Sequence, residues 1–208
     1  MTKHLVLLGD SIFDNKIYVP EGNSVHEHLI ADLSPPDTAS LVAVDGAVIS
    51  SVLRQIERVP SEATHLVLSV GGNDALYLQS SVMSETSDSV YHSLGKMKAA
   101  LETFEQEYKE VIGELQRFDL PLVVCMIYDV VPGLDDASRA GLAIINDIVT
   151  RTAFKERLTL IGLRLLCSES DDYSEVSPIE PSHEGGAKIA TAILHAVAGD
   201  AFSSKVIC

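Results

Sequence analysis

The pattern of hydrophobic and polar positions predicts strands and helices that alternate along the chain. Short apolar runs typical of buried strands cover residues 5–8, 40–44, 65–70, 121–127 and 158–163. Apolar residues at helical spacing occur over residues 20–32, 48–56, 90–118, 135–154 and 189–197. Five strands that alternate with helices favour a parallel sheet covered by helices on both faces. We therefore expect an α/β fold in a single domain over residues 1–208.

Two polar segments interrupt this pattern and predict loops. Residues 75–89 are rich in Ser, Thr, Glu and Asp, which indicates a mobile loop over a cleft or a short insertion. The acidic residues between Glu169 and Glu175 indicate a solvated loop, the usual state of a run of like charges.

Composition narrows the range of partners. The formal net charge of −15 repels the phosphates of nucleic acids and anionic membranes, so neither is an expected partner. The apolar run near the N-terminus is too short for a secretory leader, and none reaches the length of a membrane span. Cys125, Cys167 and Cys208 lack metal-type spacing and fit a reducing compartment. We expect a cytoplasmic protein with no integral membrane segment.

The candidate chemistry lies where the predicted strands end, because ligands of parallel sheets bind beyond the carboxyl ends of the strands. The first strand runs into Gly9-Asp10-Ser11, which presents the Ser11 hydroxyl as a candidate nucleophile. Gly46 follows the second strand, and Asn73 follows the third after two glycines. The backbone N–H groups of Ser11 and Gly46 and the carboxamide of Asn73 could together hold an oxyanion.

A candidate base and its orienting acid lie before the last helix. His183 follows Glu180 by three residues, with Pro181 between them. A turn there would let the Glu180 carboxylate accept from His183 Nδ1–H and leave Nε2 to face Ser11. Asp172, or a backbone carbonyl, is the alternative partner for His183.

Further residues near the strand ends are candidates for substrate contacts. These are Asp14, Asn15, Gly72 and Tyr77, together with Tyr128. Local turn bonding and packing are the alternative roles for these residues. We expect no metal site, because His26-Glu27-His28 diverges on a helix and no further ligand stands nearby.

These blocks, in this order, resemble the SGNH/GDSL hydrolase superfamily. The resemblance rests on Gly9-Asp10-Ser11, Gly46, Gly71-Gly72-Asn73-Asp74 and the carboxylate-x-x-His at 180–183. It implies a flavodoxin-like three-layer α/β/α sandwich with a five-stranded parallel sheet, no cofactor, and a serine hydrolase that acts on acyl esters. It also implies Ser11 as nucleophile, His183 as base, and an oxyanion hole of Ser11, Gly46 and Asn73. Glu180 departs from the Asp that is usual in the family.

Within this interpretation we expect small esters or short-chain acyl groups, acetyl included, as substrates. A lysophospholipase or thioesterase is an open alternative. The competing interpretation is a non-catalytic module that binds a carbohydrate or an acyl group in the same cleft, because a fold does not fix a function. The sequence does not predict the oligomeric state.

Overall fold

The computed structural model describes residues 2–199 and has one five-stranded parallel sheet. The strands are β1 (His4–Gly9), β2 (Thr38–Leu41), β3 (His65–Ser69), β4 (Leu122–Cys125) and β5 (Thr159–Ile161). Their order is β2-β1-β3-β4-β5, the order of flavodoxin-like sheets, with every neighbouring pair parallel. The predicted flavodoxin-like fold is therefore confirmed.

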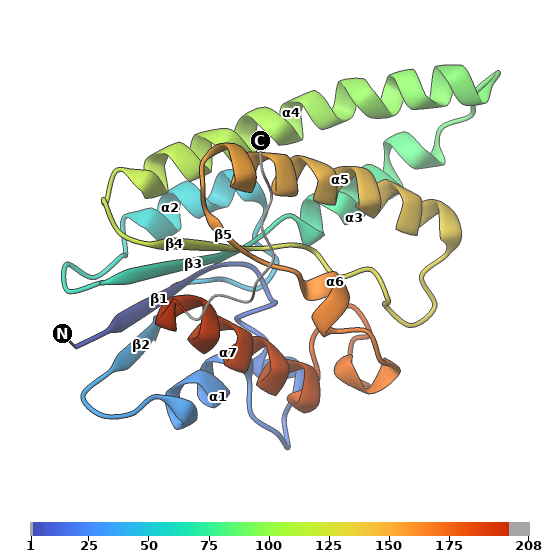
Figure 1. The fold of residues 1–208 in the computed structure, drawn as a ribbon. Helices are drawn as coiled ribbons and strands as arrows, with labels where there is room; N and C mark the ends of the chain where they lie inside the picture. The colour runs from blue at the N-terminus through green and yellow to red at the C-terminus, as the bar shows by residue number, and fades with distance from the viewer. Residues whose placement is uncertain (1, 200–208) are drawn as a thin grey trace.

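Helices cover the sheet on both sides (Figure 1). The α-helices are α1 (Val25–Asp32), α2 (Val52–Ile56), α3 (Gly72–Ser80), α4 (Val90–Gln116), α5 (Asp136–Lys155), α6 (Leu163–Leu166) and α7 (His183–Ala198). The short 3-10 helices are η1 (Lys16–Tyr18), η2 (Ile49–Ser51), η3 (Val82–Ser84) and η4 (Ser170–Asp172). One layer holds α1, α6 and α7, and the other holds α2, α3, α4 and α5.

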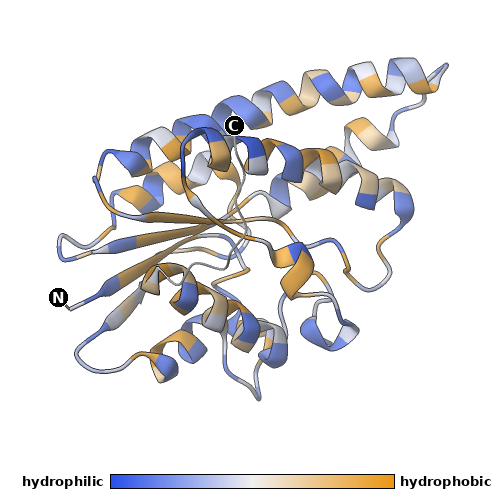
Figure 2. Ribbon diagram, viewed as in Figure 1, coloured by the Kyte–Doolittle hydropathy of each residue, from blue (hydrophilic) through white to orange (hydrophobic). Residues whose placement is uncertain are grey.

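The alternation of side chains along β1 shows how one sheet makes two cores. Leu5 and Leu7 pack toward α1 and α7, whereas Val6 and Leu8 pack toward α2, α4 and α5. Successive residues of a strand point to opposite faces, so a strand buried on both sides must be apolar throughout. Figure 2 shows the resulting concentration of hydrophobic residues in the strands and on the inner sides of the helices.

Side-chain caps begin helices α1, α4, α5 and α7. At α1 the Ser24 hydroxyl accepts from the Glu27 amide, and the Glu27 carboxylate accepts from the Ser24 amide. The hydroxyl of Ser89 and the carboxylate of Asp135 cap α4 and α5 in the same way, and Ser182 caps α7. These caps satisfy backbone N–H groups that lack an acceptor in the first helical turn.

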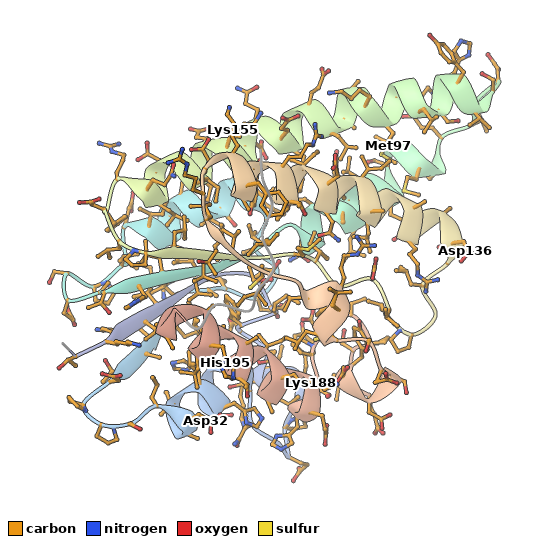
Figure 3. The ribbon with its side chains drawn as sticks, viewed as in Figure 1. Asp32, Met97, Asp136, Lys155, Lys188 and His195 are labelled. Carbon is orange, nitrogen blue, oxygen red and sulfur yellow. The ribbon has the colours of Figure 1, made fainter. Side chains whose placement is uncertain are left out.

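The two segments that the sequence predicts as loops are not simple loops. The segment over residues 75–89 contains most of α3 and then η3, so the loop prediction is wrong there. In the acidic segment, Asp172 lies in η4, is 1% exposed, and pairs with Lys188 Nζ at 2.6 Å. The ion pair with Lys188 (Figure 3), on α7, explains why this carboxylate is buried rather than solvated.

Gly9 closes β1 where the chain comes nearest to β3. Its φ is +127°, and a Cβ atom there would lie 1.7 Å from the backbone oxygen of Ser69. Gln55, from α2, holds this point from the other side: its Oε1 accepts from Gly9 N at 2.8 Å, and its Nε2 donates to Gly9 O at 2.7 Å. The close approach of β1 and β3 therefore requires glycine at position 9. This contact sets the position of the turn that carries Ser11.

Candidate active site

Ser11 lies just beyond the carboxyl end of β1, as the strand pattern predicts. The residue is 6% exposed and borders a cavity that opens at this edge of the sheet. Asp10 fixes the turn, because its carboxylate accepts from the Ile12 amide at 3.1 Å. Burial, and then the charge of Asp74, raise the pKa of Asp10 to about 7 against hydrogen bonds that lower it. Asp10 thus supports the loop that carries the hydroxyl.

Glu180 is the group that contacts this hydroxyl. Ser11 Oγ donates to Glu180 Oε1 at 2.9 Å. Glu180 is only 4% exposed, and its second oxygen, Oε2, is buried without a hydrogen-bond partner among the described residues. A buried carboxyl oxygen in this state can receive a proton or meet a ligand in the cavity.

The surroundings of Glu180 make its carboxylate unusually basic. Burial raises its pKa from 4.5 to about 8, the Ser11 hydrogen bond opposes this rise, and the charges of Asp10 and Asp45 add to it. Desolvation disfavours the charged form of a carboxyl group, and nearby negative charges act in the same direction. A carboxyl group with a pKa near neutrality is suited to take and return a proton.

The expected pairing of Glu180 with His183 does not form, which corrects the sequence prediction. His183 is exposed at the start of α7, and its Nδ1 accepts from the Asn23 amide at 2.9 Å and lies 3.1 Å from Nε2 of His28. The cause is the helix cap between the two residues: Ser182 begins α7, and the first helical residue turns toward α1. Glu180 stays on the inner side of that cap and faces Ser11 instead.

The alternative acid, Asp172, is not placed as a partner of the imidazole. Its two carboxylate oxygens bond Lys188 Nζ and the backbone N–H of Glu169. The contacts of Asp172 therefore indicate a structural role, in which the carboxylate links η4 to α7, and not the predicted role of orienting His183.

Asn73 and Gly46 lie on neighbouring loops at the same edge of the sheet. Asn73 is in the first turn of α3 and borders the cavity, and its Nδ2 donates to Ala47 O at 3.0 Å. A carboxamide carries two N–H bonds, so the bond to Ala47 orients the group while a second N–H remains. Gly46, one residue before Ala47, has φ +75° and borders a separate shallow pocket rather than the cavity at Ser11.

Of the five residues predicted to contact substrate, Gly72 and Tyr128 border the cavity and the other three are placed elsewhere. Asp14 accepts from the Asp45 amide at 2.9 Å, which is a loop contact. Asn15 is fully buried and bridges Val25 N to Pro181 O, so its amide holds the Glu180 loop in place. Tyr77 is 70% exposed on the outer side of α3. Turn bonding and helix orientation account for these three differences.

Behind Ser11 lies a mainly apolar cavity of about 90 Å³. Its polar end is formed by Asp10, Ser11, Asn73 and Glu180, at the ends of β1 and β3 and on the loop before α7. Its walls include Leu76, Met83, Met97, Ile127, Val131, Leu134, Leu142 and Ile145. Such a site, with a few convergent polar groups and apolar walls, is typical of small-molecule pockets.

Sequence reasoning missed the apolar wall of the site, including Met83 and Met97, and it did not assign Tyr128 a supporting role. Tyr128 donates from its hydroxyl to Ile179 O at 2.6 Å and thereby positions the residue next to Glu180. Glu180 itself has a signal in the sequence, because it lies between the apolar residues Ile179 and Pro181, whereas His183 has polar neighbours.

Among residues 2–199, no group of three or more His, Cys, Asp or Glu side chains is arranged to hold a metal ion. No helix in the same range is both long and apolar enough to cross a membrane. Cys125 and Cys167 are buried thiols, and Cys208 lies outside the described residues.

Solved structures similar to this one are lipases and esterases. An extracellular lipase from Streptomyces rimosus shares 17% identity at a TM-score of 0.69 and matches over 94% of this chain and 100% of its own. The acetyl xylan esterase AlAXEase shares 18% identity at a TM-score of 0.70, over 93% of this chain and 99% of its own.

A third similar structure is a member of the lipolytic protein G-D-S-L family from Veillonella parvula, with 14% identity, a TM-score of 0.69, and coverage of 95% and 99%. At these identities the likeness establishes the fold. No protein-family model matches the chain, and no curated protein matches it.

Proposed function

We propose that the protein is a carboxylic ester hydrolase in which Ser11 is the nucleophile and Glu180 is its general base. The hydrogen bond of 2.9 Å from Ser11 Oγ to Glu180 Oε1 carries this proposal. Two further facts support it: the pair lies at the polar end of an apolar cavity, and the fold is shared with lipases and esterases. The proposal keeps the serine of the sequence prediction and assigns the base to Glu180 in place of His183.

In the first half of the reaction, ionised Glu180 takes the proton of Ser11 as Oγ bonds to the carbonyl carbon of the ester. The carbonyl electrons move onto oxygen, and the N–H groups of Ser11 and Asn73, which border the cavity, are the proposed donors to that oxyanion. When the carbonyl re-forms, the C–O bond to the alcohol breaks, and the alcohol leaves with the proton held by Glu180. The product is an ester of Ser11.

In the second half, Glu180 takes a proton from water, whose oxygen attacks the acyl carbon. The bond to Ser11 Oγ then breaks, and the serine recovers its proton from Glu180 while the carboxylic acid departs. Each half returns Glu180 to its ionised state, so the side chain acts as a base and then as an acid.

The dependence of rate on pH separates Glu180 from a histidine as the base. Because only the ionised carboxylate takes the proton and burial raises the pKa of Glu180 to about 8, kcat/KM should rise up to about pH 8 and then level off. A histidine base with an ordinary pKa of about 6.5 would level off by about pH 7.5. Hydrolysis of p-nitrophenyl butyrate between pH 5.5 and 9.5 measures the difference.

Substitutions complete the test. We expect Ser11→Ala to reduce hydrolysis to background, and Glu180→Gln to reduce kcat/KM by about 10²- to 10⁴-fold, the usual worth of a general base. Glu180→His should restore part of that loss and move the profile toward the acidic side, whereas His183→Ala should keep activity within about twofold. Glu184→Gln, on an exposed carboxylate nearby, is the matched control.

A fluorophosphonate probe distinguishes the enzyme from a binding module. A reactive serine becomes covalently labelled, and Ser11→Ala abolishes that labelling. Absence of both labelling and hydrolysis in the parent protein would reject the hydrolase and favour a module that only binds its ligand. Loss of activity in His183→Ala, with Glu180→Gln active, would reassign the base to the imidazole.

A further inference from the structure

The apolar cavity behind Ser11 follows one face of α3 for its whole length. Gly72, Ala75, Leu76 and Gln79 border it on that face, and Asn73 and Leu78 of the same helix border it as well. The first four of these positions recur at the three- and four-residue spacing of a single helix face. Met83, in η3 just beyond α3, borders the same cavity. The space therefore extends from the nucleophile to the far end of the helix.

The opposite wall is α5, and it shows the same periodicity. Ser138, Gly141, Leu142 and Ile145 border the cavity from that helix, and Met97 borders it from α4, which packs beside α5 (Figure 3). Between α3 and α5 the cavity is thus an elongated space, and its polar lining there comes from Gln79 and Ser138.

The polar side chains of this inner part satisfy each other. Gln79 Nε2 donates to Ser138 Oγ at 2.6 Å, and the Ser138 hydroxyl donates to Asp135 Oδ2 at 2.7 Å. Because these groups are hydrogen-bonded to each other within the wall, they do not require a hydrogen bond from a ligand there. Apart from Tyr128, the apolar residues of the lining are aliphatic or thioether, and methionine side chains can adjust their shape to an acyl chain.

The dimensions of the cavity select an extended hydrocarbon. From Gly72 to Gln79 the axis of α3 advances about 10 Å at about 1.5 Å per residue. An extended chain of tetrahedral bonds advances about 1.2 Å per bond, as a fully extended backbone does. The cavity lining along α3 therefore spans the length of about eight such bonds.

We infer that this cavity receives the acyl chain of the substrate, and that the preferred acyl group is unbranched with about eight to ten carbons. The inference rests on the proposed function, because it places the ester carbonyl at Ser11 and the chain between α3 and α5. It replaces the sequence-based expectation of short-chain esters with a medium-chain acyl group.

Gly141 is the position at which this preference can be changed. A Cβ atom there would lie 3.2 Å from Met83 Sδ, so the glycine lets the Met83 side chain pack closely against α5 at the inner part of the cavity. A leucine at 141 should fill the inner part of the cavity, whereas a leucine at Ala140, the exposed neighbour on the same helix, should not. Met83→Ala should instead extend the cavity.

The first experiment measures kcat/KM for p-nitrophenyl esters from acetyl to palmitoyl. Each buried methylene contributes about fourfold, so the octanoyl or decanoyl ester should exceed the acetyl ester by about 10²-fold or more. Gly141→Leu should lower kcat/KM for the decanoyl ester about tenfold or more and leave the acetyl ester within about twofold. Ala140→Leu should match the parent at every length.

Met83→Ala provides a second variant, which removes atoms and does not rely on the fit of a larger side chain. We expect its optimum to move toward longer esters by about two carbons. A parent that prefers the acetyl ester, or a chain-length profile that is the same in the parent, Gly141→Leu and Met83→Ala, would overturn the inference.

Binding of free fatty acids separates this inference from the proposed function. In the Ser11→Ala protein, calorimetry should detect sodium octanoate at least about tenfold more tightly than sodium butyrate. If esters of every length resist hydrolysis while octanoate binds and Gly141→Leu abolishes binding, the hydrolase is wrong and the acyl cavity stands. If octanoate binds no better than butyrate, the acyl cavity is wrong.

Discussion

Replacing Glu180 with glutamine tests whether the buried carboxyl group makes stability depend on pH. Burial raises the pKa of Glu180 from 4.5 in the unfolded chain to about 8 in the folded protein. In that range the folded state binds more protons than the unfolded chain, so the free energy of unfolding falls as pH rises. The contribution of Glu180 is complete below about pH 4.5 and is lost as pH rises through about 8.

The size of the effect follows from the same change in pKa. A rise of about 3.5 in pKa corresponds to at most about 5 kcal/mol, at about 1.4 kcal/mol per unit. Water that enters the cavity beside the ionised carboxylate reduces this cost. We therefore expect Glu180→Gln, which remains neutral, to gain about 2–3 kcal/mol over the parent protein between pH 5 and pH 9.

Urea denaturation followed by circular dichroism at pH 5, 7 and 9 measures this difference. The parent and the variant share the titration of Asp10, whose pKa burial raises to about 7, so comparing them isolates Glu180 to first order. Glu184→Gln is the control, since it removes a carboxylate that is exposed. If Glu180→Gln follows the parent in parallel at all three pH values, burial does not perturb Glu180 and the argument for a basic carboxylate is wrong.

Three further substitutions test the elements around the site. Asn73→Ala should fold and lower kcat about 10²- to 10³-fold, the usual cost of losing an oxyanion donor, and steady-state kinetics would refute the role if kcat were unchanged. Gln55→Leu removes the side-chain partner of the buried Gly9 amide and one of two donors to the Gly9 carbonyl, which still accepts from Val44 N, and it should lower the free energy of unfolding by about 1–3 kcal/mol in urea. Lys188→Met leaves the Asp172 carboxylate buried without its cation and should cost about 1–2 kcal/mol at pH 7, by the same measurement; an unchanged midpoint would show that the pair contributes nothing.

The fold could be predicted from the sequence because its central strands are buried on both faces. A run such as residues 5–8 has few alternatives to a strand in a covered sheet, and the glycine that follows it marks the edge at which Ser11 emerges. The helix α3 was not predicted, since its inner face carries small and polar residues that hide the helical period.

The sequence predicts the placement of the site residues that directly follow a strand. It does not predict the direction in which side chains of the loop before α7 point. Ser11 and Asn73 follow strands, so the sheet fixes their edge. The separation of Glu180 from His183 depends on a helix cap at Ser182 and on the bond from Asn15 to the Pro181 carbonyl. The three-residue spacing carries no information about either contact. It therefore predicts a pairing of Glu180 with His183 that the structure does not contain.

The apolar cavity and the basicity of Glu180 have one physical cause. The walls that suit a hydrocarbon chain also keep water from the carboxyl group, and this desolvation is the largest contribution to its raised pKa. An ordinary carboxylate, with a pKa of about 4.3, would be a poor base for a serine hydroxyl, whereas one held near neutrality is well matched to that task. An acyl chain that fills the cavity displaces further water and strengthens the same effect. The proposed selection of the chain and the proposed activation of the serine thus depend on one apolar environment, and a substitution that makes the cavity more polar should weaken both.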